Sequence, residues 1–275
     1  MGTETYTYRY PHPAMTADCV IFGFDGEQMK VLLIERGLEP YKGMWALPGG
    51  FMRINETIEE AACRELFEET GLKDVFMEQF KVFSAVDRDP RERVVTVAFI
   101  ALVRPADYHL VAGDDAANAL WFDHNMLPPM AFDHAEIIKQ ARNHLSEVLR
   151  IKPLAFELLN KVFSISELQR VYEAISGVHY DRRNFHRKAM QSGLLVEIPT
   201  RVANDYEISR NSGMVKTPVA ESICDSSKII GLSEKADAPG QPGRRATKLY
   251  TLKSIIKNSD SESDDEASTR DLFDF

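Results

Sequence analysis

A run of fixed residues between Gly50 and Leu72 limits the folds open to this 275-residue chain more than any other feature. Gly50 is followed after five residues by Glu56, and after seven more by the unbroken run Arg-Glu-Leu-Phe-Glu-Glu-Thr-Gly-Leu, which ends at Leu72. Seven fixed residue types at an average usage of roughly 6% each would coincide by chance about once in 10⁸ windows. The run therefore indicates a functional unit rather than an ordinary solvated helix face.

The second half of this run has the spacing of a helix over residues 57–70, and Gly71 is a natural residue to end it. At about 100° per residue, the carboxylates of Glu65, Glu68 and Glu69 fall within an arc of about 100°. The other face of the helix, which we expect to pack on a sheet, holds Ala62, Cys63, Leu66, Phe67 and Thr70.

Three carboxylates this close repel one another and resist joint ionisation unless a cation offsets their charge. The cluster therefore predicts a site for a hard divalent ion, Mg²⁺ or Mn²⁺. Arg64 lies four residues after Glu60 and four before Glu68, so we expect it to orient carboxylates rather than to contact substrate. Glu56 is a further candidate partner for Arg64 across the loop.

The segments around the run predict an α/β fold for an N-terminal domain at residues 1–150. Two apolar, β-branched stretches flank the turn Phe24-Asp25-Gly26 and predict a hairpin. The order of elements favours a mixed sheet with helices on both faces. Strands are expected at residues 17–25, 30–35, 75–86 and 94–103, and a second helix at residues 133–149.

After Lys152-Pro153 the pattern changes to short elements, which predicts a small α+β domain at residues 151–255. Ser164 and Glu167 stand at the spacing of a capping box, and Asp181 is a candidate N-cap. A Ser-, Gly-, Pro- and Asn-rich stretch at 199–245 predicts a flexible insertion. Three helices and two strands are expected, at residues 153–159, 164–175, 181–193, 194–198 and 247–252.

The formal net charge of −9 is distributed unevenly along the chain. Seven acids and one base lie in residues 259–275, which leaves a net charge of only −3 on the other 258 residues. We expect residues 256–275 to form a disordered acidic tail. The acidic total does not exclude a nucleic-acid partner, because only the charge of the contacting face matters.

The composition, 44% hydrophobic and 27% charged, is that of a soluble globular protein with room for two cores. Three cysteines without CxxC spacing predict neither a disulfide framework nor a zinc site. The N-terminal residues lack the order of a signal peptide, and no apolar run reaches the ~20 residues that span a bilayer. We expect a cytoplasmic protein without a membrane partner.

Candidate ligand contacts flank the fixed run. The aromatic side chains there could stack on a nucleobase, although packing against the loop is an alternative for Trp45 and Phe51. The arginines of residues 87–93 could bind phosphates, or could form a mutually paired surface turn. The predicted ligand contacts are Arg36, Tyr41, Trp45, Phe51, Arg88 and Arg91.

The helix predicted at 181–193 carries cations near its N-terminal half, which suits insertion into the major groove of DNA. Phe185 and Met190 would pack inward. A basic helix that only pairs with acids or solvent is the alternative. The predicted DNA contacts are Arg182, Arg183, His186 and Arg187 on this helix, with Arg244 and Arg245 before the last strand.

The run from Gly50 to Leu72 resembles the Nudix box at every specified position. The resemblance implies a Nudix α/β/α sandwich and Mg²⁺-dependent hydrolysis of a nucleoside diphosphate linked to another group. It implies a catalytic set of Arg64, Glu65, Glu68 and Glu69, and metal contacts from these glutamates and Gly50, with Glu65 and Glu69 as the principal ligands. The resemblance leaves the general base open between the box and a later loop. Asp114, Asp115 and Glu136 are nominees, and an ordinary surface acid is the alternative for each.

Stretches outside the box resemble a narrower group, the Nudix-related transcriptional regulators of NAD metabolism or arabinose use. This resemblance implies ADP-ribose as the ligand, a C-terminal winged helix that binds double-stranded DNA, and a homodimer, since paired winged helices read paired half-sites. The intact box favours retained hydrolysis; a ligand-sensing regulator with little hydrolysis is the alternative. The matching stretches are residues 33–37, 45–51, 87–91, 132–134, 166–169, 171–175 and 181–185.

Overall fold

The computed structural model describes residues 7–110, 116–199 and 248–253, and it divides into two compact units, Met1–Leu145 and Ser146–Phe275. The elements that begin in the first unit are β1 (Ala14–Phe24), β2 (Met29–Arg36), β3 (Trp45–Ala46), β4 (Gly49–Phe51), α1 (Ile58–Thr70), β5 (Glu78–Phe83), β6 (Val94–Val103), η1 (Pro105–Asp107), β7 (Ala116–Asp123) and α2 (His134–Val148). Those of the second unit are η2 (Leu154–Leu158), α3 (Ile165–Ser176), α4 (Arg182–Gln191), β8 (Leu195–Ile198) and β9 (Leu249–Leu252).

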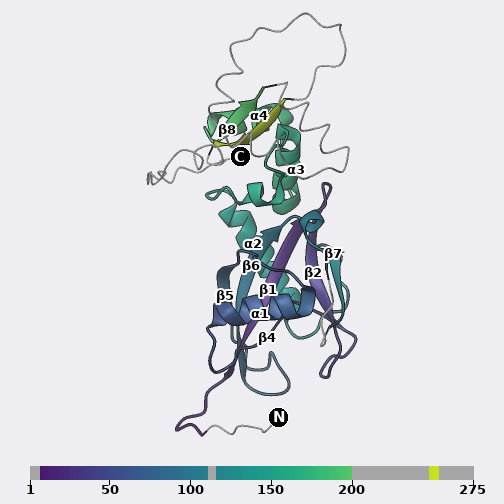
Figure 1. Cartoon of the computed structure of the whole chain (residues 1–275), viewed down its shortest axis with the longest axis vertical. Coiled ribbons are helices and arrows are strands. Elements are labelled where there is room, and N and C mark those ends of the chain that lie inside the picture. The colour runs from purple at the N-terminus through teal and green to yellow at the C-terminus, as the bar shows by residue number, and fades with distance from the viewer. Residues whose placement is uncertain (1–6, 111–115, 200–247, 254–275) are drawn as a thin grey trace, which may run out of the picture. The chain divides into compact units, whose positions relative to one another are not determined.

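In the described part of the first unit, the strands form a 7-stranded mixed sheet (Figure 1). Strands β1 and β6 run parallel, and the other pairs are antiparallel. The edge of β1 that faces away from β6 changes partner, because residues 16–18 pair with β4 whereas residues 22–24 pair with β2. The sheet therefore opens beside the middle of β1.

Helices lie on both faces of this sheet, as the sequence predicts. Helix α1 crosses one face of the sheet (Figure 1). Leu66 of this helix packs in one core cluster with Ala17 and Cys19 of β1. Side chains alternate along a strand, so Asp18 points to the opposite face. There its carboxylate lies 3.7 Å from His134, the first residue of α2.

The predicted limits of α1 are confirmed, and its ends are capped by local contacts. Thr57 and Glu60 form a capping box at the start, and Gly71 ends the helix with a φ of 76°. The predicted packing of Cys63 and Phe67 on the sheet is wrong, because both side chains are exposed. The buried face is instead rotated toward Ala61, and Glu65 and Glu69 lie on this side of the helix.

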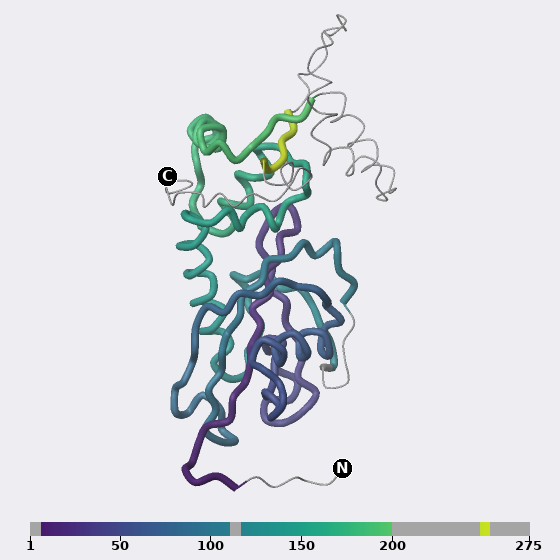
Figure 2. Tube along the Cα trace, turned by 60° about the vertical axis from the view of Figure 1, so that its left-hand side comes forward, coloured from purple at the N-terminus to yellow at the C-terminus, as the bar shows by residue number. Residues whose placement is uncertain are grey.

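In its described residues, the second unit has the predicted order of three helices and two antiparallel strands, although the first helix, η2, is a 3₁₀ helix rather than an α-helix. Figure 2 shows β9 beside β8 despite the long sequence between them. Ser164 and Glu167 form the predicted capping box, and the Asp181 side chain caps α4. The inward orientation predicted for Met190 is wrong, since its side chain is 40% exposed and Ala189 is buried instead.

Three features of the sheet differ from the sequence-based expectation. Strand β7 was not expected, β5 is shorter than the predicted strand at 75–86, and β3 and β4 form within an expected loop. Residues 200–247 and 254–275, where the insertion and the acidic tail are predicted, lie outside the described residues. Within the described part, no helix has the length and apolar character needed to cross a membrane.

Candidate functional site

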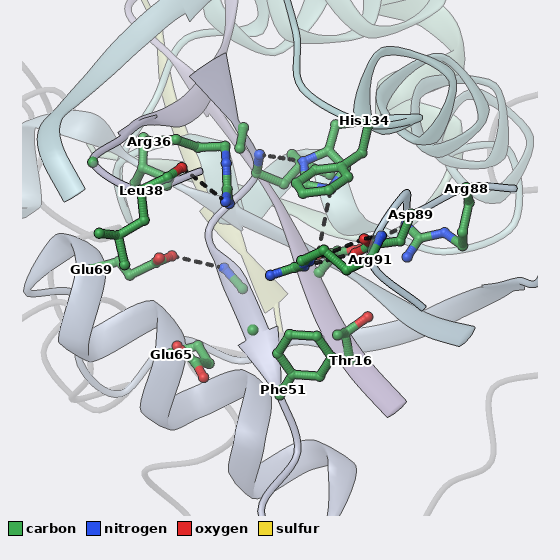
Figure 3. Close-up of a pocket in the computed structure, with 18 of the residues that line it drawn as sticks. Thr16, Arg36, Leu38, Phe51, Glu65, Glu69, Arg88, Asp89, Arg91 and His134 are labelled. Atoms are coloured by element: carbon green, nitrogen blue, oxygen red, sulfur yellow. Dashed lines mark hydrogen bonds and ion pairs between the residues drawn. The ribbon is translucent and has the colours of Figure 1, made fainter. Parts of the chain in front are cut away.

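A pocket with a volume of about 270 Å³ lies where β1 changes partner from β4 to β2. Glu65 and Glu69 reach it from α1, and Arg36 and Arg91 reach it from other elements (Figure 3). Of the predicted metal and ligand residues, the structure brings together Arg36, Gly50, Phe51, Glu65, Glu69, Arg88 and Arg91.

Two glutamates face the pocket because the buried side of α1 includes them. Ala61, Ala62 and Leu66 are buried on this helix, and at about 100° per residue Glu65 and Glu69 fall within the same arc. Glu68 falls outside it, with 47% of its side chain exposed, and does not line the pocket.

Two glycines of β4 allow these carboxylates to approach the strand closely. The Glu69 Oε2 atom accepts a hydrogen bond from the Gly49 N–H at 2.8 Å. Gly49 has a φ of 154°, and a Cβ there would overlap the Ala17 carbonyl oxygen. A Cβ at Gly50 would overlap the Glu65 carboxylate, so a larger residue at position 50 would displace that side chain.

The two glutamates lie in an environment that disfavours their ionised forms. Burial raises the pKa of Glu69 to about 8, and the negative charges of Glu65 and Asp18 add to this shift. Burial also raises the pKa of Glu65, although the Arg64 guanidinium opposes the effect. A cation placed between these side chains would favour their ionisation.

Arg64 forms ion pairs with three acids of the box. Its Nε and Nη2 atoms donate to the two Glu56 oxygens at 2.9 and 2.5 Å, which confirms the predicted pairing across the loop. Its Nη1 atom donates to Glu65 at 2.7 Å and to Glu68 at 3.1 Å. Glu60 instead accepts a hydrogen bond from the Thr57 N–H.

The predicted arginines of the ligand set have different partners. Arg36 donates to the Pro40 carbonyl oxygen at 2.9 Å, and Arg91 donates to both Asp89 oxygens at 3.0 and 2.7 Å. Arg88 is buried and donates to Asp18 at 3.3 Å and to Asp133 at 2.7 and 3.0 Å. Its guanidinium group therefore joins β1 to the start of α2.

The predicted aromatic residues lie at different distances from the pocket. Phe51 lines it, with the Arg91 guanidinium 5.0 Å from the ring centroid. Trp45 does not line it, and its ring packs edge-on against Phe122 of strand β7 at 4.5 Å rather than against the predicted loop. Tyr41 also lies outside the lining and contacts Phe132 edge-on at 4.9 Å.

Several pocket residues were missed at the level of sequence. Asp89, Phe132 and His134 stand in stretches that carry the family resemblance, but the pattern assigned them no role. Asp18 had a signal of its own, since it is an acid within a buried apolar strand and buried acids need a partner. Of the nominated general bases, Glu136 is exposed and outside the pocket lining, and Asp114 and Asp115 lie outside the described residues.

The predicted DNA contacts on α4 share one exposed surface. The buried residues of this helix are Phe185 and Ala189. Arg244 and Arg245 lie outside the described residues, and the nearby Lys248 pairs with Glu197 at 2.8 Å. The exposed residues of the surface are Arg182, Arg183, His186 and Arg187.

Two known family models match this chain, one in its N-terminal part and one in its C-terminal part. A NUDIX domain matches residues 12–141, and an NrtR DNA-binding winged helix domain matches residues 155–207. The ADPR responsive transcriptional repressor NtrR of Acinetobacter baylyi is 34% identical over 191 residues, which cover 68% of this chain and 76% of the repressor. The similarity therefore extends through both domains.

Two further relatives share parts of this similarity. The ADP-ribose pyrophosphatase of Methanocaldococcus jannaschii is 48% identical over 130 residues, which cover 47% of this chain and 73% of that enzyme. The crystal structure of Shewanella oneidensis NrtR complexed with a 27mer DNA matches with a TM-score of 0.59 and 26% identity, over 88% of this chain and 95% of that one. This chain belongs to the Nudix-related transcriptional regulators, with a Nudix domain followed by an NrtR-type winged helix.

Proposed function

We propose that the Nudix domain binds ADP-ribose and hydrolyses its diphosphate, and that the winged helix binds DNA. One observation carries the proposal: the Glu65 and Glu69 carboxylates share a pocket with the guanidinium groups of Arg36 and Arg91 (Figure 3). Arginines bind phosphate oxygens directly, and a carboxylate pair can hold a divalent ion against the same group. The pocket thus offers both kinds of contact that a diphosphate needs.

A divalent ion suits the carboxylate side of the pocket. The pKa of about 8 at Glu69 reflects burial and the nearby charge of Glu65, both of which a cation would offset. In residues 7–110, 116–199 and 248–253, no three His, Cys, Asp or Glu side chains are grouped closely enough to hold an ion. Mg²⁺ is commonly held by one or two carboxylates together with waters and substrate phosphates, so such a group is not required.

We therefore assign Glu65 and Glu69, beside the Gly50 backbone, to Mg²⁺ or Mn²⁺. When bound, such an ion offsets the diphosphate charge and lowers the pKa of an attacking water. Arg64 orients Glu65, and Glu68 shares that arginine from outside the pocket. This arrangement leaves Arg36 and Arg91 to bind the diphosphate.

ADP-ribose is the proposed ligand because two relatives are named for it, one as a pyrophosphatase and one as an ADPR-responsive repressor. The complete box favours retained hydrolysis over a pocket that only senses a ligand. Arg88 is already neutralised by Asp18 and Asp133, so we assign it to the pocket wall rather than to the phosphates.

Turnover tests the enzymatic part of the proposal. Purified protein with Mg²⁺ and ADP-ribose should release AMP and ribose 5-phosphate, and Glu69→Gln should abolish the release. Glu59→Gln makes the same change at an exposed position of α1 and should leave the rate unchanged. If a broad panel of nucleoside diphosphate derivatives gives no product with the wild type, the hydrolytic assignment is wrong.

The DNA-binding part rests on the exposed cations of α4 and on the match to the NrtR winged helix. Gel shifts on the upstream region of the protein's own gene should show binding that weakens as salt rises, because phosphate contacts release counterions. Arg183→Ala should weaken this binding. A homodimer is expected, since paired winged helices read paired half-sites, and light scattering in solution measures it.

A second candidate function is a ligand-controlled repressor with little hydrolysis. The similarity to the Acinetobacter repressor favours it, because that similarity covers both domains. In that case, ADP-ribose added without a divalent ion should change the gel shift. The turnover assay with ADP-ribose and Mg²⁺ should give no product. Product formation without any effect of ADP-ribose on DNA binding would favour the enzyme alone.

A further inference from the structure

The ring of Phe132 links the two arginines that we assign to the diphosphate. The Arg36 guanidinium carbon lies 4.9 Å from the ring centroid, and that of Arg91 lies 5.5 Å from it. Phe132 also lines the pocket. A guanidinium group over an aromatic ring is attracted to its electron-rich face, so one side chain can steady both cations.

Phe132 has a backbone conformation that bulky residues seldom adopt. Its φ is 52°, and its edge-on neighbour Tyr41 has a φ of 66°. Such conformations persist where surrounding contacts impose them, and they are frequent at ligand sites. The two residues after Phe132 are both fixed, because Asp133 accepts hydrogen bonds from Arg88 and His134 accepts one from the Leu47 N–H.

The two arginines are also fixed away from the ring. Arg36 donates to the carbonyl oxygens of Leu38 and Pro40, and Arg91 donates to the buried carboxylate of Asp89. Burial lowers the pKa of Arg36, and the like charge of Arg91 lowers it further. Both cations are therefore held near each other before any ligand arrives. Asp89 already offsets part of the Arg91 charge, and a ligand with two linked anionic groups could contact both guanidinium groups.

We propose that Phe132 determines specificity by setting the positions of the Arg36 and Arg91 guanidinium groups, so that the pocket prefers two linked phosphates to a single phosphate. This inference rests on the proposed function of the same pocket. It assigns to Phe132 a positioning role that is separate from the carboxylates of the box.

Binding calorimetry without divalent ions tests this role, because no turnover complicates the measurement. Phe132→Leu keeps an apolar side chain without the aromatic face, and Phe132→Gly suits the observed φ but removes the ring. Each should weaken ADP-ribose binding about tenfold while changing AMP binding less than about threefold. Phe132→Tyr retains the ring and should bind like the wild type.

Phe76→Leu is the matched control, since this residue is 83% exposed and does not line the pocket. It should leave the affinities for both ligands unchanged. An equal loss for ADP-ribose and AMP in both Phe132 variants would overturn the proposal, because a general disturbance of the pocket weakens both ligands. Unchanged ADP-ribose binding in these variants would overturn it as well, while the proposed function would stand.

A separate outcome tests the function itself. If the wild type neither binds ADP-ribose without divalent ions nor hydrolyses it with Mg²⁺, the proposed function is wrong, and inorganic pyrophosphate and phosphate then serve as the probes. The role of Phe132 holds if the wild type prefers pyrophosphate and the Leu and Gly variants lose that preference. It is overturned if the preference is absent in the wild type or persists in the variants.

Discussion

The Nδ1 atom of His134 accepts a hydrogen bond from the Leu47 N–H at 2.9 Å. An accepting nitrogen carries no proton, so this contact requires a neutral imidazole with its proton on Nε2. Burial lowers the pKa of His134, and the nearby Asp18 carboxylate opposes the shift only in part. The wall of the pocket therefore depends on a neutral histidine.

The stability of the protein should consequently fall when this histidine is forced to ionise. The folded-state pKa lies below the unfolded value of about 6.5, so the unfolded chain binds the proton more readily. The contribution of His134 is fully present above about pH 6.5 and is lost as the pH falls through the folded-state pKa. Thermal unfolding from about pH 7.5 to about pH 5.5 should show a steeper loss for the wild type than for His134→Gln.

His109→Gln provides the control, because His109 is exposed in the same unit. Its unfolding profile should follow the wild type across the same pH range. Parallel profiles for the wild type and His134→Gln would show that unfolding does not change proton binding at His134.

Gly50→Ala should impair catalysis through the position of Glu65 rather than through the backbone. The added Cβ would overlap the Glu65 carboxylate, whereas Gly50 has no positive φ that would strain an alanine. A displacement of about 1 Å at a reacting group can lower the rate about 10²-fold. The rate of AMP release from ADP-ribose measures the effect.

Gly26→Ala separates this steric effect from backbone strain. Gly26 has a φ of 102° with open space around a Cβ, so its substitution should lower the stability without the same loss of rate. A normal rate in Gly50→Ala would mean that Glu65 can move away from the strand at no catalytic cost.

The local signals of the sequence were sufficient for α1 but not for the strands around the pocket. Helix α1 carries its own start and stop at Thr57 and Gly71, so its limits could be predicted. Strand β7 begins Ala-Ala-Asn-Ala, residue types that favour strands weakly, and it is fixed by pairing with β2. That pairing joins residues far apart in the sequence, which local periodicity cannot reveal.

The same distinction applies to the pocket. The proximity of Glu65 and Glu69 could be predicted from the box, because both residues lie on one helix. The pairing of Asp18 with Arg88 joins residues 70 positions apart, and no spacing rule predicts it. The predicted grouping of Glu68 with these acids depended on which arc of α1 is buried, and only packing against the sheet decides that.

Glu56→Gln should lower the stability of the protein above about pH 4.5 and have a smaller effect at lower pH. Hydrogen bonds from Arg64 hold the pKa of Glu56 at about 2, below its usual value of 4.5. The stabilisation is therefore complete above about pH 4.5 and is lost as the pH falls toward about 2. The difference in melting temperature between the wild type and Glu56→Gln should narrow over this range, and Glu59→Gln should show no such trend. A constant difference would contradict the assigned pairing.

Glu173 should fix the turn that leads into α4. Its Oε1 atom accepts from the Tyr180 N–H and from the Gln169 side chain, each at 2.9 Å, and the Gln169 amide also donates to the Tyr180 carbonyl oxygen. Glu173→Ala leaves the partly buried Tyr180 N–H without this acceptor, which should lower the free energy of unfolding by about 1–3 kcal/mol.

Glu173→Ala should also weaken DNA binding, because Tyr180 immediately precedes Asp181, the residue that caps α4. Urea unfolding and gel shifts measure the two effects on the same preparation. Glu157→Ala is the matched control, since Glu157 is exposed on η2, and it should change neither quantity. If Glu173→Ala loses stability but binds DNA with unchanged affinity at every salt concentration, the turn contributes to folding and does not orient α4 on DNA.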